Sequence, residues 1–356
     1  VYMLFRQDIE EIYEKVNAAI GDEAFAKLTI LVSATHNHMG PDTSGLDAIN
    51  DRYFQYMTSQ MSRAVLEAID DDTLRPAHLV AATSKHAFGM ADGTAPFIAD
   101  PTLNSLQAVS SDDNTVIATL VQWQNHPEDT LSFGRDVYAT EAQSEYLQSI
   151  GECYTDDEVQ CYIEGQYISA GFSGYAVWRT MQETGAPALY FNGPVGSMLT
   201  PLDATIWETE GESGRPPGNG IDIPEGAVLL EKSFHKLAVN GNELGKRVIA
   251  DLEAGERITE VPIRMYTEEF YTRLSNWGFR VALAVRPNGQ PLGLGHRKRE
   301  LYTCPDTGPH TDETCVSDDY ASEPDPILLA PTRVGTFLKS EVHYLKIGPI
   351  GMITIP

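Results

Sequence analysis

The sequence predicts an α/β fold in which mixed β-sheets are flanked by α-helices, and three observations support this prediction. Segments with apolar residues at helical spacing alternate along the chain with shorter apolar runs typical of buried strands. The 356 residues, 42% of them hydrophobic, are enough to bury a large core. No run of about 18 apolar residues occurs, so no transmembrane segment is expected. We assign residues 1–356 to a single domain.

The first predicted elements are amphipathic helices, each followed by a strand. Asp8–Ile20 carries apolar residues at helical spacing and leads into Leu28–Ala34, an apolar run that predicts a buried strand. A second helix over about Asp51–Ile69 precedes a strand at Ala77–Thr83. The next apolar run, beginning at Val116, predicts a strand that ends close to His126.

The later elements continue the alternation. Helices are predicted at Ser173–Thr184 and Glu225–Glu253, the second long enough for Asn240-Gly241 to break it. Strands are predicted near Val261–Tyr266, Phe279–Val285 and Glu341–Ile355. Two polar, Pro-containing loops lie among these elements, at Gly211–Gly220 and Pro305–Pro326. Loops of that length usually shape a site or are disordered.

Histidines follow two of the predicted strands. His36 and His38 are one residue apart, so on a strand they would share a face and suit a metal site, one ring on the ion and the other beside it. The alternative is a strand end with two solvated rings. His126 also stands at the end of a predicted apolar strand, which ends there because Pro127 cannot continue a strand ladder. Two strands that each deliver imidazoles at their ends indicate the floor of a catalytic cleft.

These motifs resemble those of neutral, non-lysosomal ceramidases. Ser33–Thr43 is similar to the Gly-Thr-His-Thr-His-Ser-Gly-Pro signature of that family, and Asn125-His126-Pro127 is similar to its second metal-bearing motif. Further matches follow in the family's order, at Ile168–Tyr175, Ala188–Gly193 and the closing strand pair Val334–Gly348 and Met352–Pro356. The chain therefore resembles a divergent bacterial-type member, with a neutral-ceramidase-like catalytic domain.

The resemblance implies metal-assisted amide hydrolysis. His36 and His126 match the family's two imidazole ligands of Zn²⁺, and His38 matches a histidine beside the ion that could donate to the oxyanion or the leaving amine. Zinc lowers the pKa of a bound water to about 7 and polarises a carbonyl. The implied protein is a secreted enzyme of sphingolipid or related lipid metabolism. Its substrate would be a ceramide-like lipid or another N-acyl amide, met by peripheral contact with a membrane.

The chain departs from the family at two substrate motifs. The family's acid or amide and its serine fall at Gly196–Pro201, where Thr200 is the stand-in for the serine and Ser197 or Met198 occupies the acidic position. Asp203 is near enough in sequence to compensate. The family's Asn-Arg pair is replaced by Ser84–Met90. We therefore expect altered substrate contacts and poor cleavage of ceramide itself.

The metal site is incomplete within the recognised motifs. The family's remaining ligands, a Glu and a Tyr, would lie beyond Pro356, and the chain begins at Val1 without an initiator Met. We expect a sequence truncated at both ends. The alternative is that Asp42, Glu128 or Asp129 completes the ligand set.

Charge and cysteines narrow the class of protein. Asp and Glu number 51 against 25 Lys and Arg, a formal net charge of −26, which disfavours nucleic acid as a partner. The four cysteines form two local pairs, Cys153 with Cys161 and Cys304 with Cys315, neither at zinc-knuckle spacing. Two local disulfides in an exported, extracellular or periplasmic protein are the preferred interpretation over free thiols.

Two other functions stay open. The first is a catalytically inactive, acidic, disulfide-bonded surface or assembly protein that keeps the fold, favoured by the altered Ser197-Met198 position. The second is a calcium-binding adhesive domain, based on acidic loops such as Thr155–Glu158 and Asp318-Asp319, although such clusters are usually only solvated. The remaining histidines lack the metal-site context and are expected to be ordinary surface or core residues: His78, His86, His235, His296, His310 and His343.

Overall fold

The computed structural model has the mixed α/β architecture that the sequence predicts, with helices and two five-stranded sheets. It describes residues 3–44, 50–70, 74–92, 99–128, 144–145, 148–149, 168–195, 201, 203–211, 217, 222–231, 233–275, 302–305, 307–317 and 337–354. The chain divides into two compact units, one made of residues 34–40 and 75–261, the other of residues 2–33, 41–74 and 262–356. Assignment of the chain to one domain stays a prediction.

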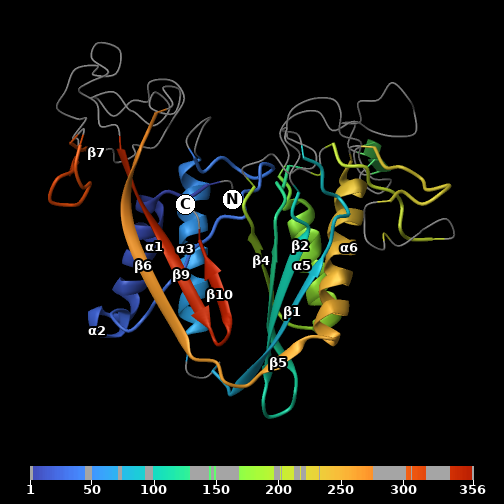
Figure 1. Ribbon diagram of the computed structural model, residues 1–356, viewed down its shortest axis with the longest axis horizontal. Helices are drawn as coiled ribbons and strands as arrows, with labels where there is room; N and C mark the ends of the chain where they lie inside the picture. The colour runs from blue at the N-terminus through green and yellow to red at the C-terminus, as the bar shows by residue number, and fades with distance from the viewer. Residues whose placement is uncertain are drawn as a thin grey trace. The chain divides into compact units, whose positions relative to one another are not determined.

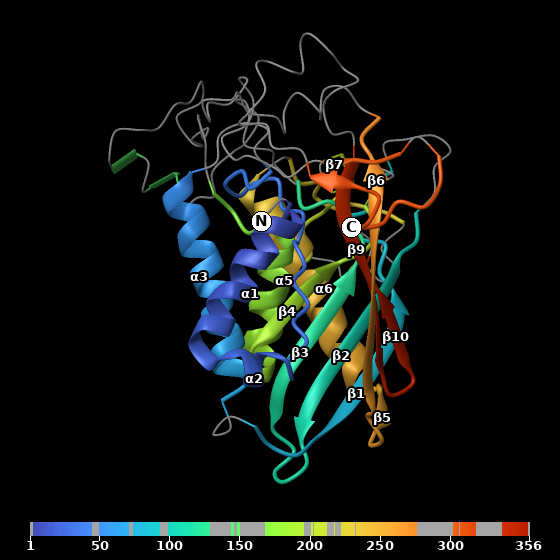
Figure 2. The ribbon, with the colours of Figure 1, turned by 90° about the vertical axis from the view of Figure 1, so that its left-hand side faces the viewer.

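The first unit is a sheet with two helices on one face (Figures 1 and 2). Its strand order is β4-β3-β2-β1-β5, and only β3 and β4 are parallel. The elements are β1 (Ala77–Lys85), β2 (Thr102–Ser110), β3 (Val116–Trp123), α5 (Gly171–Thr184), β4 (Ala188–Asn192), α6 (Phe234–Glu253) and β5 (Glu256–Ile258). Because β3 and β4 are parallel and Trp123 pairs with Asn192, both strands deliver their next residues to the same edge of the sheet.

The core of this unit lies between the sheet and the two helices. Trp123 and Phe172 are fully buried and meet edge to face, their ring centroids 5.4 Å apart. Leu244 and Val248 of α6 complete the cluster on the helical side. The indole N–H of Trp123 donates to the carbonyl of His86 at 3.0 Å, so even this buried polar group has a partner. The packed end of β3 therefore gives the residues after it a rigid base.

The second unit contains a helix pair and the other sheet. Helix α1 packs on α3, with Ile12 and Phe54 fully buried on them. The sheet has the order β10-β9-β7-β8, with β6 paired along β9. The elements are α1 (Arg6–Ile20), α2 (Asp22–Phe25), α3 (Asp51–Ala68), β6 (Ile263–Arg273), β7 (Tyr302–Thr303), β8 (Val316–Ser317), β9 (Phe337–Ile347) and β10 (Ile350–Ile353).

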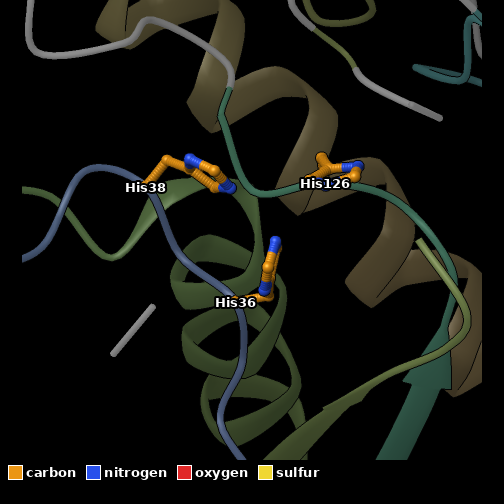
Figure 3. Close-up of side chains that lie close together, drawn as sticks. All are labelled: His36, His38 and His126. Carbon is orange, nitrogen blue, oxygen red and sulfur yellow. The ribbon is translucent and has the colours of Figure 1, made fainter. Parts of the chain in front are cut away.

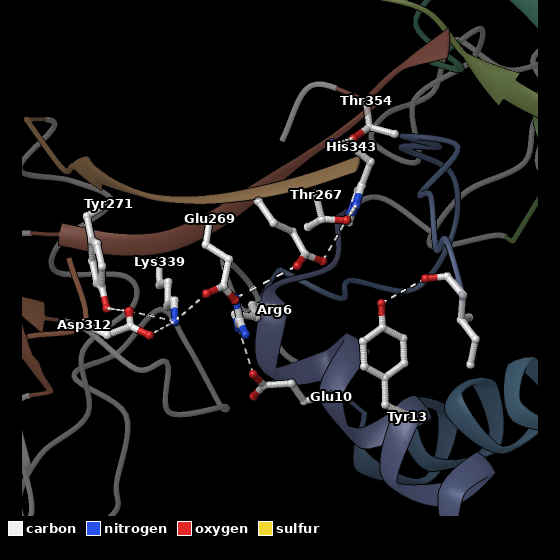
Figure 4. A network of polar contacts seen from close by, with 12 residues as sticks. Arg6, Glu10, Tyr13, Thr267, Glu269, Tyr271, Asp312, Lys339, His343 and Thr354 are labelled. Atoms are coloured by element: carbon white, nitrogen blue, oxygen red, sulfur yellow. Dashed lines mark hydrogen bonds and ion pairs between the residues drawn. The ribbon is translucent and has the colours of Figure 1, made fainter. Parts of the chain in front are cut away.

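Charged residues link α1 to this sheet (Figure 4). Glu269 on β6 accepts from Arg6, at the start of α1, and from Lys339 on β9 at 3.0 Å. Burial alone would raise the pKa of Glu269, but the hydrogen bonds from Lys339 and Arg6 together outweigh it and hold that pKa below its usual value. Asp312 binds the same Lys339 at 2.9 Å. The two cations thus join α1, β6 and β9 within one unit.

Two predicted elements are wrong in detail. Residues 28–35 form no strand, because an apolar run alone cannot distinguish a strand from an irregular extended segment. The helix predicted at Glu225–Glu253 begins only at Phe234, where Ser233 caps it by accepting from the Lys236 N–H at 3.1 Å. Residues 228–230 instead bond to residues 206–208.

Asn240-Gly241 does not break α6, because Gly241 serves helix packing. A Cβ there would lie 2.3 Å from the carbonyl oxygen of Phe172 on α5. The other predicted helices and the strands near Ala77 and Val116 are confirmed within a few residues. The strand near Val261 is confirmed but runs on to Arg273, and the segment Glu341–Ile355 contains parts of two strands, β9 and β10. Strands β2, β5, β7 and β8 had not been predicted, and Phe279–Val285 lies outside the described residues.

Candidate metal centre

Three histidine side chains converge in the first unit (Figure 3). His126 is buried and follows the end of β3 by three residues, at the edge where β4 also ends. His36 and His38 are partly buried and lie on the irregular segment 34–38. The ring centroid of His36 is 4.8 Å from that of His38 and 5.0 Å from that of His126. The structure therefore brings together the three histidines that the sequence singles out.

The donor set fits a metal ion. One ring nitrogen from each histidine can be chosen so that all three lie within 4.8 Å of one another, and no other described His, Cys, Asp or Glu joins the group. Nitrogens about 2.0–2.1 Å from one tetrahedral ion are separated by about 3.4 Å, so small ring rotations would close the set. Three imidazoles with a fourth position open are a recurrent ligand set of catalytic zinc.

The protonation state of His38 is also suited to a metal centre. Burial, followed by the neighbouring His36 and His126, lowers the pKa of His38 from 6.5 to about 4. His38 is therefore neutral at physiological pH, and a neutral imidazole has the lone pair that binds a metal or accepts a hydrogen bond.

The segment that carries His36 and His38 is held without a strand ladder. Asn37, between the two histidines, is buried and donates from Nδ2 to the carbonyl of Ser169 at 2.6 Å, while its Oδ1 accepts from the Met39 N–H at 2.9 Å. The His38 N–H donates to the carbonyl of Pro127 at 3.0 Å, which joins this segment to the residue after His126. These bonds perform the positioning that a β-strand was predicted to provide.

Residues at the ends of β3 and β4 support the other side of the group. Asn125 is fully buried and donates from Nδ2 to the carbonyl of Gly89 at 2.8 Å. Asn192, the last residue of β4, donates from Nδ2 to the carbonyl of Thr35 at 3.1 Å and accepts from the Asn125 N–H at 3.3 Å. Sequence reasoning gave neither Asn37 nor Asn192 a role. A polar amide at the end of the short apolar run 188–191 was the available signal for Asn192.

The other predicted site residues are not part of the histidine group. Glu128 is buried and described but is not among its members, and Asp203 is exposed. Asp42 belongs to the second unit and accepts from Ser44. Asp129, Ser197, Met198 and Thr200 lie outside the described residues, so the roles predicted for them stay predictions.

Most of the remaining histidines have ordinary surroundings. His235 bonds to Glu208 at 2.6 Å, and His343 bonds to Thr267 at 2.8 Å. His78 and His86 are buried and His310 bonds to the carbonyl of Pro305, whereas His296 lies outside the described residues.

One predicted cysteine pair is described. The sulfur atoms of Cys304 and Cys315 are 2.05 Å apart, the distance of a disulfide, and the bridge spans the loop between β7 and β8. Cys153 and Cys161 lie outside the described residues. No helix in the described ranges is both long and apolar enough to cross a membrane.

Two solved structures with a similar fold are ceramidases. The chain matches the crystal structure of neutral ceramidase from Pseudomonas aeruginosa with a TM-score of 0.53 and 15% identity, over 100% of this chain and 53% of that one. It matches a structure described as ceramidase complexed with C2 with a TM-score of 0.51 and 13% identity, over 99% of this chain and 54% of that one.

The chain thus spans about half the length of these structures, and the likeness is one of fold. No protein-family model matches the sequence, and no curated protein sequence matches it.

Proposed function

We propose that the chain carries the metal centre of a secreted, zinc-dependent amidohydrolase that cleaves a ceramide-like lipid or a related N-acyl amide. The observation that carries this proposal is the convergence of His36, His38 and His126 in a fold similar to that of neutral ceramidase. Zinc, when bound, supplies a water activated at neutral pH and a Lewis acid for the amide carbonyl.

The roles of the three histidines differ in this proposal. His36 and His126 hold the ion, as the motif resemblance implies. His38 stands beside it as a neutral imidazole that donates a hydrogen bond to the oxyanion or assists the leaving amine. Its place in the group also allows a third-ligand role. Thr200 and Ser197 are proposed to contact the substrate, in place of the serine and acid of the family.

Zinc analysis and turnover of the full-length protein test this function. We expect about one zinc per chain, slow cleavage of ceramide and faster cleavage of another N-acyl amide from a panel with varied amine groups. His36→Asn should lose both zinc and turnover. Asparagine is chosen because the His36 backbone is left-handed, with φ of 59°, and asparagine tolerates that conformation.

The matched control is His235→Asn, which alters an exposed histidine of the same unit and should keep both properties. Turnover that survives in zinc-free His36→Asn would refute the proposal. His38→Gln separates the two roles of His38. A loss of zinc comparable to that of His36→Asn indicates a ligand, whereas retained zinc with reduced kcat indicates a hydrogen-bonding role.

The rival function is a catalytically inactive extracellular surface or assembly protein with the same fold. The altered Ser197-Met198 position favours it, because catalysis by metal also needs groups that orient the substrate. Stoichiometric zinc binding without turnover of any amide in the panel would support this rival.

A further inference from the structure

We propose that Asn192 is a positioning residue that couples the two histidine-bearing segments of the metal centre. This inference rests on the proposed function, since it assigns Asn192 a role in holding His36 and His126 at metal-binding distance. Asn192 is assigned this role through its hydrogen bonds to the two segments, and it is not proposed as a metal ligand.

The geometry of a single amide carries the proposal. Asn192 Nδ2 donates at 3.1 Å to the carbonyl of Thr35, the residue before His36. Its Oδ1 accepts at 3.3 Å from the N–H of Asn125, the residue before His126. A carbonyl can only accept and an N–H can only donate, so the two partners themselves determine which end of the amide faces each segment.

We call these two hydrogen bonds, from Asn192 to Thr35 and from Asn125 to Asn192, the Asn192 clamp. The fold explains why the clamp is needed. His126 is three residues beyond a packed strand, but residues 28–37 have no strand partner, so no ladder holds His36 in register with it. Asn192 itself is rigidly placed, because it ends β4 in register with Trp123, and the hydroxyl of Tyr190 on the same strand donates to the Trp123 carbonyl at 2.8 Å. The Asn192 side chain thereby fixes the irregular segment that carries His36 to the end of β4.

Two variants separate the two hydrogen bonds of the clamp. Asn192→Ala removes both hydrogen bonds and also the 3.5 Å contact from the Tyr190 hydroxyl to Asn192 Oδ1. Asn192→Asp keeps an acceptor for the Asn125 N–H and the Tyr190 hydroxyl and loses the donor to Thr35. The matched control is Asn104→Ala in the same sheet. The Asn104 amide also bridges two strands, donating to Gln122 at 2.7 Å and accepting from Thr83 at 2.9 Å, and neither partner belongs to residues 34–40 or 124–128.

Hydrogen exchange and zinc affinity of the full-length protein are measured together. In the metal-free protein, Asn192→Ala should increase exchange in peptides covering both residues 34–40 and 124–128, and Asn192→Asp should do so mainly in 34–40. Asn192→Ala should weaken zinc binding about 10-fold or more, as loss of supporting contacts around ligands does. Asn104→Ala should change the zinc dissociation constant by less than about 2-fold.

The outcomes distinguish this proposal from the proposed function. If the wild-type protein binds no zinc while Asn192→Ala still raises exchange in both segments, the metal function fails and the clamp stands. If zinc binds but Asn192→Ala resembles Asn104→Ala in exchange and affinity, the clamp is refuted and the metal function stands.

Discussion

The backbone of His36 is in the left-handed region, with φ of 59°, which few residues other than glycine adopt. Such a conformation costs about 1–3 kcal/mol and persists only where the surroundings impose it. Here the surroundings are the bond from Asn192 to Thr35 on one side and the buried Asn37 on the other. The strained residue is thus one of the three that form the candidate metal centre.

His38 should make the stability of the metal-free protein depend on pH. Its folded-state pKa of about 4 lies below the ordinary 6.5, so between these values the unfolded chain binds more protons than the folded one. The free energy of unfolding should therefore fall as pH falls from about 6.5 to about 4, by at most about 1.4 kcal/mol per pH unit from this group. Chemical denaturation of the full-length protein across that range measures the slope.

The comparison variant is His38→Gln, whose slope should be smaller than that of the wild-type protein. Some slope should persist, because burial and then Arg247 lower the pKa of His86 to about 3, which acts in the same direction. His310→Gln, at a histidine whose ring bonds to the backbone carbonyl of Pro305, serves as the control. Equal slopes in His38→Gln and the wild-type protein would contradict the assignment.

At the scale of elements, the approach of α5 to α6 depends on glycines in a helix interior. A Cβ on Gly241 would lie 2.4 Å from the Cβ of Tyr175, and one on Gly245 would lie 2.7 Å from the Cβ of Arg179. Both distances are shorter than real contacts between side chains. The glycines therefore allow α5 and α6 to pack closely against each other.

Gly241→Ala should destabilise the protein although alanine favours helices. Helix propensity alone would stabilise by about 1 kcal/mol, but overpacking against a backbone carbonyl costs about 1–3 kcal/mol or more. We expect a net loss, seen as a lower midpoint in urea. Ala250→Gly, at an exposed position of the same helix, calibrates the propensity term and should cost about 1 kcal/mol. A more stable Gly241→Ala variant would show that α5 and α6 are not so close.

The Cys304–Cys315 bridge should stabilise the β7–β8 loop of the second unit. It closes a loop with a sequence separation of 11, and both cysteines pack with Phe337 of β9. Replacing both by serine should cost about 2–3 kcal/mol in the chain-entropy model. Thermal unfolding measures the loss, and mass analysis of a non-reduced digest tests this pairing and the predicted Cys153–Cys161 pairing together. Peptides in which Cys304 or Cys315 is bonded to Cys153 or Cys161 would contradict the predicted pairing.

At the scale of the whole molecule, the net charge of −26 dominates the electrostatics. Like charges repel within a compact chain and are screened over about 10 Å at 0.1 M salt. We expect the melting temperature of the full-length protein to rise between about 10 mM and 500 mM sodium chloride, with chloride replaced by acetate as the control for specific anion binding. A melting temperature that falls with salt would mean that attractive ion pairs, such as those of Glu269, outweigh the repulsion.

Much of the fold and the membership of the candidate site could be predicted from the sequence. The helices near Asp8 and Asp51 follow from apolar spacing, which is a local property of the chain. The strand before His126 and the pairing of Cys304 with Cys315 also depend on near neighbours in sequence. His36, His38 and His126 stood out because each followed an apolar run.

Only the tertiary structure decided how these residues meet. The parallel pairing of β3 with β4 places Asn192 beside the segment that leads to His126, and no local pattern specifies that pairing. The apolar run before His36 was wrongly predicted as a buried strand, because an apolar run specifies neither burial nor the partners of the backbone groups. Residues 28–34 are partly buried or exposed and form no strand. The amide of Asn192 takes the place of the missing ladder, and its two bonds exist only once distant segments are packed together.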